Sequence, residues 1–99
     1  MMNQAMLRKM QQMKKDMEKT QDEIMNTEFK TTCGPVTVIV MGDRNLKQII
    51  FEEGFEATTA DDLEMLADMI VAATRQAGDE IDKFTAEKMS KYQALLGGF

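Results

Sequence analysis

Apolar side chains recur at helical spacing in the first quarter of the chain. Within residues 3–25 they are separated by 4, 3, 4 and 7 positions, and they are Met6, Met10, Met13, Met17 and Ile24. This heptad-like spacing lines them up along one helix face. Most of the other positions hold Gln, Lys, Glu or Asp, which lose little rotamer freedom in a helix. The pattern predicts a helix over residues 3–25.

The apolar period shortens to two residues in the next segment. Val36, Val38 and Val40 alternate with Ile39 and Met41, which predicts a strand over 36–41 with apolar side chains on both faces. Residues 26–32 and 46–51 are predicted to form two further strands. The sequence Cys33-Gly34-Pro35 breaks the first strand, and residues 42–45 supply turn residues. Connections this short predict an antiparallel meander.

A second helical pattern covers residues 60–91. Thr59 precedes it, and Asp62 follows three residues later, which is the order of a capping box. A continuous apolar stripe runs along this segment through Leu63, Leu66, Ile70, Ala73, Ala77, Ile81 and Phe84. Lys88 and Lys91 occupy the positions where the stripe would continue. We therefore expect the helix to leave the core near Phe84 and residues 92–99 to form a loose tail.

The order helix, three strands, long helix predicts an α+β fold in a single domain over residues 1–99. One chain of 99 residues has too little material to cover two apolar sheet faces and two helical seams. A second copy is the simplest cover, so we expect an isologous homodimer. The residues expected in the core or the dimer interface are Met10, Met13, Met17, Val38, Val40 and Ile50.

Charge is segregated along the chain. The net charge is −5, yet residues 1–20 carry five basic residues against two acidic ones, a net +3, and the remainder carries −8. On a helical wheel Arg8, Gln12, Lys15 and Lys19 fall opposite the methionine seam and form a stripe about 16 Å long. The two helices are expected to place their distal ends side by side, where Lys88 and Lys91 extend the stripe. Such a stripe can meet several phosphates; the alternative is an ordinary solvated helix face.

The sequence gives little support for catalysis, metal binding or cofactor binding. There is no histidine, which removes the usual general base, and no phosphate-binding glycine loop or nucleophile elbow is present. We expect no enzyme, metal or cofactor. The methionine seam as a copper(I) site and Cys33 as a redox sensor are weaker interpretations than packing. The acidic pairs 52–53 and 61–62 are better explained by a strand end and a helix cap.

The location expected from the sequence is the cytoplasm. A single cysteine favours a reducing compartment. The N-terminal residues show no signal peptide, and the longest apolar run, residues 69–73, is too short to span a membrane.

With these elements in this order, the chain resembles the YbaB/EbfC family. The resemblance lies in the Met-, Gln- and Lys-rich first helix, the strands 36–42 and 46–51, and above all the run from Glu64 to Ala73 followed by Glu87-Lys88-Met89. It spans roughly residues 2–92. It implies a tweezer-shaped homodimer with sheets at the base and paired helices as arms, binding to double-stranded DNA with little sequence preference, location in the cytoplasm or nucleoid, and no catalysis.

Two departures from the family pattern concern turns. Residues 51–55 lack the Asp-Pro common after the third strand, and Cys33-Gly34-Pro35 replaces a more glycine-rich turn. Two other functions stay open. One is a protein-interaction adaptor in replication or recombination with incidental DNA contact, since methionine-rich surfaces adapt to partners. The other is a chaperone-like dimer without a ligand, which no positive feature supports.

Overall fold

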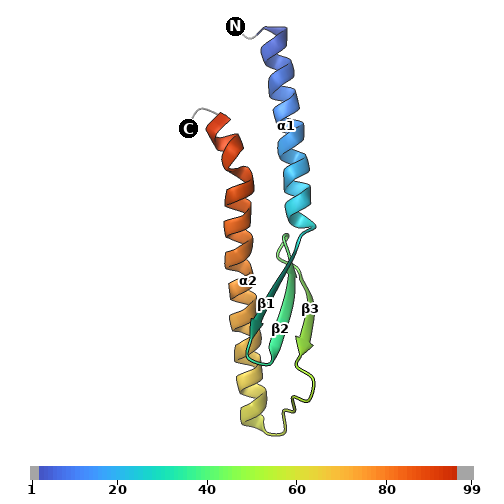
Figure 1. The fold of residues 1–99 in the computed structure, drawn as a ribbon, viewed down its shortest axis with the longest axis vertical. Coiled ribbons are helices and arrows are strands. Elements are labelled where there is room, and N and C mark those ends of the chain that lie inside the picture. The colour runs from blue at the N-terminus through green and yellow to red at the C-terminus, as the bar shows by residue number, and fades with distance from the viewer. Residues whose placement is uncertain (1–2, 96–99) are drawn as a thin grey trace.

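The computed structural model describes residues 3–95, which form an elongated body of 70 × 21 × 15 Å (Figure 1). The elements follow one another as α1 (Gln4–Met25), β1 (Glu28–Cys33), β2 (Val36–Met41), β3 (Leu46–Phe51) and α2 (Ala60–Leu95). The expected order of helix, three-stranded antiparallel sheet and long helix is confirmed. The predicted bounds of β2 and β3 agree with the observed strands.

The three strands form one sheet in the order β1-β2-β3. Cys33 pairs with Val36 across the first hairpin, and Val36 pairs with Phe51 across the second. A bulge near Ile39 and Val40 leaves Lys47 as the extra residue of β3, and Lys47 forms an ion pair with Glu28. The meander predicted from the short connections is therefore present.

The core lies between the sheet and the first two-thirds of α2. Val36, Val38 and Val40 alternate with less buried neighbours along β2 and face Ala73, Ala77 and Ile81 of α2, as the sequence stripe predicts. The core residues Phe29, Val36, Val38, Val40, Ala73, Ala77 and Ile81 are all buried. The hydroxyl of Thr31 donates to the carbonyl of Ala73 at 2.6 Å, so its burial leaves no unpaired donor.

Two predicted boundaries are wrong at the first strand. Asn26 caps α1, and its backbone N–H and side chain both bond to the carbonyl of Asp22. Thr27 also turns back and bonds to Ile24 and Glu23. These two residues close the helix, so β1 begins at Glu28 rather than at residue 26. β1 also keeps Cys33, because the turn needs only Gly34, at φ +56°, and Pro35.

The predicted end of the second helix is also wrong. The helix continues to Leu95, and Tyr92 is only 4% exposed, so residues 92–95 are not a loose tail. Residues 96–99 lie outside the described residues. Beyond Phe84, α2 runs along α1 rather than into solvent. At the other end of the stripe Leu63 is 58% exposed, because the first turn of α2 precedes the contact with the sheet.

Candidate nucleic-acid interface

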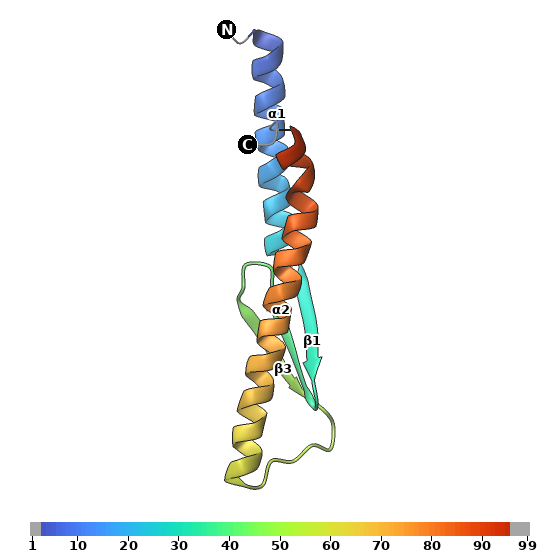
Figure 2. The ribbon, with the colours of Figure 1, turned by 90° about the vertical axis from the view of Figure 1, so that its left-hand side faces the viewer.

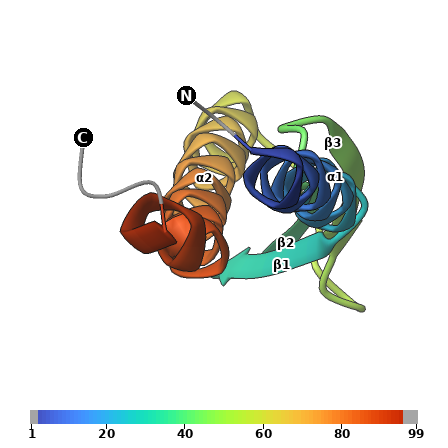
Figure 3. The same ribbon diagram turned by 90° about the horizontal axis from the view of Figure 1, so that it is seen from above.

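The two helices run side by side beyond the sheet and form an arm. Figure 2 shows the distal half of α2 beside α1, and Figure 3, viewed from above, shows the two helices next to each other. The hydroxyls of Thr20 and Tyr92 lie 2.9 Å apart, which joins the helices across the seam. Near the base the buried side chain of Ile24 anchors the foot of α1. The distal ends of both helices therefore lie at one end of the molecule, as predicted.

The tip of the arm is formed by α1 alone. Figure 1 shows α1 extending beyond the end of α2. The first turn is capped by Asn3, whose side-chain oxygen accepts from the N–H of Met6 at 2.8 Å. Every residue from 3 to 12 is exposed. The tip is therefore held by the Asn3 cap and by continuity with the rest of α1, without tertiary cover from the described residues.

The arm is tied to the sheet at one close contact. The N–H of Gly42 donates to the carbonyl of Thr27 at 3.0 Å. A Cβ placed at Gly42 would lie 1.7 Å from the carbonyl oxygen of Ile24, a distance no side chain can tolerate. Glycine at this position lets the end of α1 sit directly on the β2–β3 turn. Arg44 in the same turn forms an ion pair with Asp82 of α2, so the turn holds both helices.

The predicted phosphate-contacting residues are all exposed on the arm, and the regular helix over Gln4–Met25 keeps the four on α1 at spacings of 4, 3 and 4 along one side: Arg8, Gln12, Lys15 and Lys19. Gln12 turns toward α2, lines the groove between the helices, and donates to Asp16 at 3.0 Å. Lys15 lies on the outer side of α1 in a shallow hollow shared with Lys14. Arg8 belongs to the exposed tip. This side of α1 therefore lies between the groove that faces α2 and the hollow on the outer side of the helix.

The two lysines predicted on the second helix have different surroundings. Lys91 lines one hollow together with Lys19, so the structure brings together two predicted cations that are 72 residues apart in the chain. Its ammonium also lies 5.0 Å from the ring centre of Tyr92. Lys88 lies closer to the sheet, with its ammonium 5.3 Å from the ring centre of Phe84. Lys88 is therefore farther from the tip than the sequence argument assumed.

Sequence reasoning left out two cations of the arm. Lys9 lines the groove between the helices, and Lys14 shares the outer hollow with Lys15. The helical-wheel argument does not include Lys9 and Lys14, because both fall outside the predicted stripe on α1. Both lysines are nevertheless exposed, so they add to the cationic surface of the arm. The signal was available in the sequence, since residues 4–15 contain four basic residues and no acidic one.

The opposite end of the molecule has the reverse charge. Residues 52–74 contain seven acidic residues and no basic one. Asp62 completes the predicted capping box: its carboxylate accepts from the N–H groups of Thr58 and Thr59, and its own N–H donates to the hydroxyl of Thr59. These hydrogen bonds, the one from Thr58 first, lower the pKa of Asp62. Phosphates would be repelled from this end and attracted to the other.

The predicted core and interface residues fall into two groups. Val38 and Val40 are buried, and Met13 and Met17 are half-buried along the arm. Met10 is 49% exposed and Ile50 is 36% exposed. Within residues 3–95, no cluster of His, Cys, Asp and Glu could hold a metal ion. Over the same residues, no helix is long and apolar enough to cross a membrane.

Residues 1–96 match the YbaB/EbfC DNA-binding family. The chain belongs to this family. YbaB/EbfC proteins bind DNA and are not enzymes, so the basic arm is the part of this fold to examine for DNA contact.

Curated relatives agree with this family membership. A nucleoid-associated protein of Ligilactobacillus salivarius is 37% identical over 96% of this chain and 91% of its own. One from Enterococcus faecalis is 33% identical over 97% and 92%, and one from Lactococcus lactis subsp. cremoris is 37% identical over 93% and 94%. The YbaB/EbfC resemblance therefore extends over both helices and the sheet.

Proposed function

We propose that this YbaB/EbfC protein is a nucleoid-associated homodimer that binds double-stranded DNA in the bacterial cytoplasm through the phosphates. The cations of the arm make the contact. The observation that carries the proposal is the separation of charge along a 70 Å molecule. One end has four basic and no acidic residues over residues 4–15, and the other has seven acidic and no basic residues over residues 52–74. The basic end attracts a polyanion and the acidic end repels it.

The contact proposed here is largely independent of base sequence. Arg8, Lys15 and Lys19 are exposed cations with long, flexible side chains, and they are spaced along one side of α1. Long basic side chains in this arrangement neutralise phosphates and release counterions, so DNA affinity should fall steeply as salt rises. Lys91 shares a hollow with Lys19 and extends the cationic surface onto α2.

The homodimer is supported by an uncovered apolar surface beside β3. α2 packs across β1 and β2. Phe51 and Leu46 pair with Val36 and Val40 and share the core-facing side of the sheet, yet they are 47% and 45% exposed. An apolar strip next to an unpaired strand edge is a surface that a second copy can cover.

The DNA contact is tested by charge reversal on the arm. The variant Arg8→Glu/Lys15→Glu/Lys19→Glu should bind duplex DNA at least roughly a hundredfold more weakly at low salt, with a smaller slope of log affinity against log salt. The matched control Lys30→Glu/Arg75→Glu/Lys83→Glu changes the net charge equally, at exposed positions away from the α1 tip. It should retain most of the affinity. Equal losses in both variants would mean that net charge, and not the arm, governs binding.

The dimer is tested by sedimentation velocity. Leu46→Glu/Phe51→Glu should shift the protein toward a single subunit while circular dichroism keeps its helical signal. An unmodified protein that sediments as one subunit would contradict the proposed dimer. If the unmodified protein ignored DNA at low salt but retained a specific protein partner, the adaptor function would replace DNA binding.

A further inference from the structure

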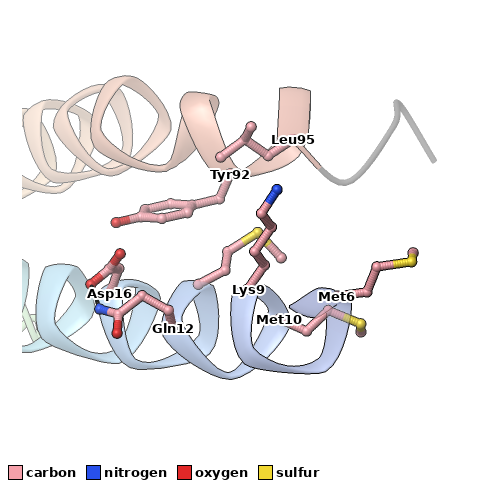
Figure 4. Close-up of a pocket in the computed structure, with 8 residues that line it drawn as sticks. Met6, Lys9, Met10, Gln12, Asp16, Tyr92 and Leu95 are labelled. Carbon is pink, nitrogen blue, oxygen red and sulfur yellow. Dashed lines mark hydrogen bonds between the residues drawn. The ribbon is translucent and has the colours of Figure 1, made fainter. Parts of the chain in front are cut away.

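The arm contains an apolar groove, called here the arm groove, that the proposed DNA contact does not use. It has a volume of about 430 Å³ and lies between the tip of α1 and the last turn of α2. Figure 4 shows the side chains of Met6, Met10 and Lys9 on one side and of Tyr92 and Leu95 on the other. Met6 is 50% exposed, Met10 is 49% exposed and Leu95 is 70% exposed. The arm groove therefore presents thioethers and an aliphatic chain to solvent.

The outer part of the arm groove is basic. Lys9 lines it, and residues 4–15 of α1 contain no acidic residue. The first acidic residue of α1, Asp16, lines the end of the groove nearer the sheet, where it accepts a hydrogen bond from Gln12. An occupant that suits this groove therefore has apolar side chains on one face and acidic side chains beside them.

The start of α2 presents a surface of this kind. Leu63, Ala67 and Val71 are four residues apart, so they follow one side of the helix, and all three are exposed. Leu63 is 58% exposed and Val71 is 48% exposed. Glu64 and Asp68, also exposed and four residues apart, run beside them. These five residues, called here the acidic face of α2, form an amphipathic surface that the described residues of the same chain leave uncovered.

The arm groove and the acidic face also match in length. The lining of α1 extends about 10.5 Å from Met6 to Met13, and α2 rises about 12 Å from Leu63 to Val71. An amphipathic helix that lies in an apolar groove uses side chains at such spacings. Leu63 and Leu95 are separated by about 48 Å along one continuous helix. A chain therefore cannot place its own acidic face in its own arm groove.

We propose that the acidic face of α2 of a second copy docks in the arm groove, with its apolar side chains against Met6, Met10 and Met13. Methionine side chains adapt to the shape of the apolar side chains that they meet. Asp68 of the second copy then lies beside Lys9 of the first, and the opposite charges of the two surfaces favour their encounter. The contact removes from water apolar side chains that each chain alone leaves exposed.

This contact is separate from the apolar strip beside β3 that is proposed to join the homodimer. Each chain has one arm groove and one acidic face, so docking links homodimers to one another. The hollow with Lys14 and Lys15 lies on the outer side of α1 and stays open to phosphates when the arm groove is filled. Binding of linked homodimers along DNA rests on the proposed function, whereas the docking itself does not.

Disulfide trapping between two chains tests the docking. In a Cys33→Ser background, a Met10→Cys chain is mixed with an isotope-labelled Ala67→Cys chain, oxidised mildly and analysed by mass spectrometry. The mixed disulfide should form roughly ten times faster than in two matched controls. In one control Gln11→Cys replaces Met10→Cys, because Gln11 lines the outer hollow of α1. In the other Met65→Cys replaces Ala67→Cys, because Met65 is exposed on the opposite side of α2.

Two outcomes of the trapping experiment overturn the proposal. Equal rates for the three pairs would show that the acidic face does not favour the arm groove. Trapping that disappears when Leu46→Glu/Phe51→Glu is added would make the contact a part of the proposed homodimer interface and not a separate site. The experiment contains no DNA, so failure here is distinguishable from failure of the proposed DNA contact.

Charge exchange tests the pairing of opposite signs. Lys9→Glu should weaken self-association roughly threefold in sedimentation at low salt, and Asp68→Lys added to it in the same chain should restore the association. Asp79→Lys, at an exposed position of α2 outside the acidic face, makes the same change in net charge and should not restore it. Equal rescue by both lysines would assign the effect to net charge and overturn the proposal, and so would no rescue by Asp68→Lys.

Discussion

The base and the arm of this protein are held together by different means. The base has a close-packed core in which Val36 and Val38 are fully buried and β2 is hydrogen-bonded on both sides. The arm has two buried side chains, Ile24 at its foot and Tyr92 along its seam, and one hydroxyl pair across the helices. Stability therefore resides mainly in the base, while the exposed cations reside on the arm. Substitutions in the base should therefore change mainly the free energy of unfolding, and substitutions of the arm cations mainly the affinity for DNA.

The largest expected effect is in the core of the base. Ile81 is 2% exposed and packs with β2 and α2 neighbours. Ile81→Ala removes buried methylenes and leaves a cavity, so the free energy of unfolding should fall by about 2–5 kcal/mol. Urea denaturation measures it. Met65→Ala, at a position 46% exposed on the same helix, should cost far less; similar losses would contradict the proposed location of the core.

A smaller effect is expected where the arm joins the base. Gly42→Ala forces a Cβ against the Ile24 carbonyl, so the backbone must shift, and unfolding should become easier by about 1–3 kcal/mol. Gly78→Ala provides a control of opposite sign. A Cβ there meets only the end of the Arg44 side chain at 3.4 Å, and alanine favours a helix by roughly 0.5–1 kcal/mol. Thermal unfolding of both variants checks the two signs.

The seam of the arm should contribute less again. Tyr92→Phe and Thr20→Val each remove one hydroxyl of the pair, and the coupling measured by a double-mutant cycle should be about 0.5–1.5 kcal/mol. Urea titration gives the global value, and amide exchange along α1 shows where it acts. A coupling near zero would mean that ring packing alone holds the helices together.

The smallest effect concerns the cap of α2. The pKa of Asp62 is lowered from its ordinary value of 3.8 by hydrogen bonds from Thr58 and Thr59. A lowered pKa in the folded state means that the charged carboxylate stabilises the fold above the ordinary pKa, and that this stabilisation is lost as pH falls through the folded-state pKa. Asp62→Asn should be slightly less stable than the unmodified protein at pH 7. Urea midpoints should converge in strong acid, and a constant gap would exclude this cause.

The sequence predicted the base better than the arm. Alternation at Val36, Val38 and Val40 reports burial directly, because a two-sided sheet leaves each side chain only two environments. The start of β1 is predicted two residues too early because Asn26 and Thr27 have good strand or turn chemistry, whereas in the structure they bond back to Asp22, Ile24 and Glu23 in the last turn of α1. These bonds are local, and they close the helix in place of strand pairing.

The candidate site was predicted in composition but not in geometry. The basic residues of α1 follow from the sequence, whereas the placement of Lys19 beside Lys91 depends on how far two helices overlap. That overlap is set by the Thr20–Tyr92 contact, and Tyr92 was assigned to a tail because Lys88 and Lys91 interrupt the apolar stripe. Lysine stems pack over aromatic rings while their ammonium groups reach water, so the stripe continues beneath them.

Gly42 lies directly against the C-terminal end of α1, so a change in the backbone there would tilt the whole helix. A helix of 22 residues is about 33 Å long. A tilt of about ten degrees at its foot would therefore sweep its far end through roughly 6 Å, close to the rise of two base pairs. Because all five basic residues of α1 lie on one helix, a single backbone adjustment at Gly42 would move them together: Arg8, Lys9, Lys14, Lys15 and Lys19. The position of the proposed DNA-contacting cations is therefore determined at the base of the arm, far from the cations themselves.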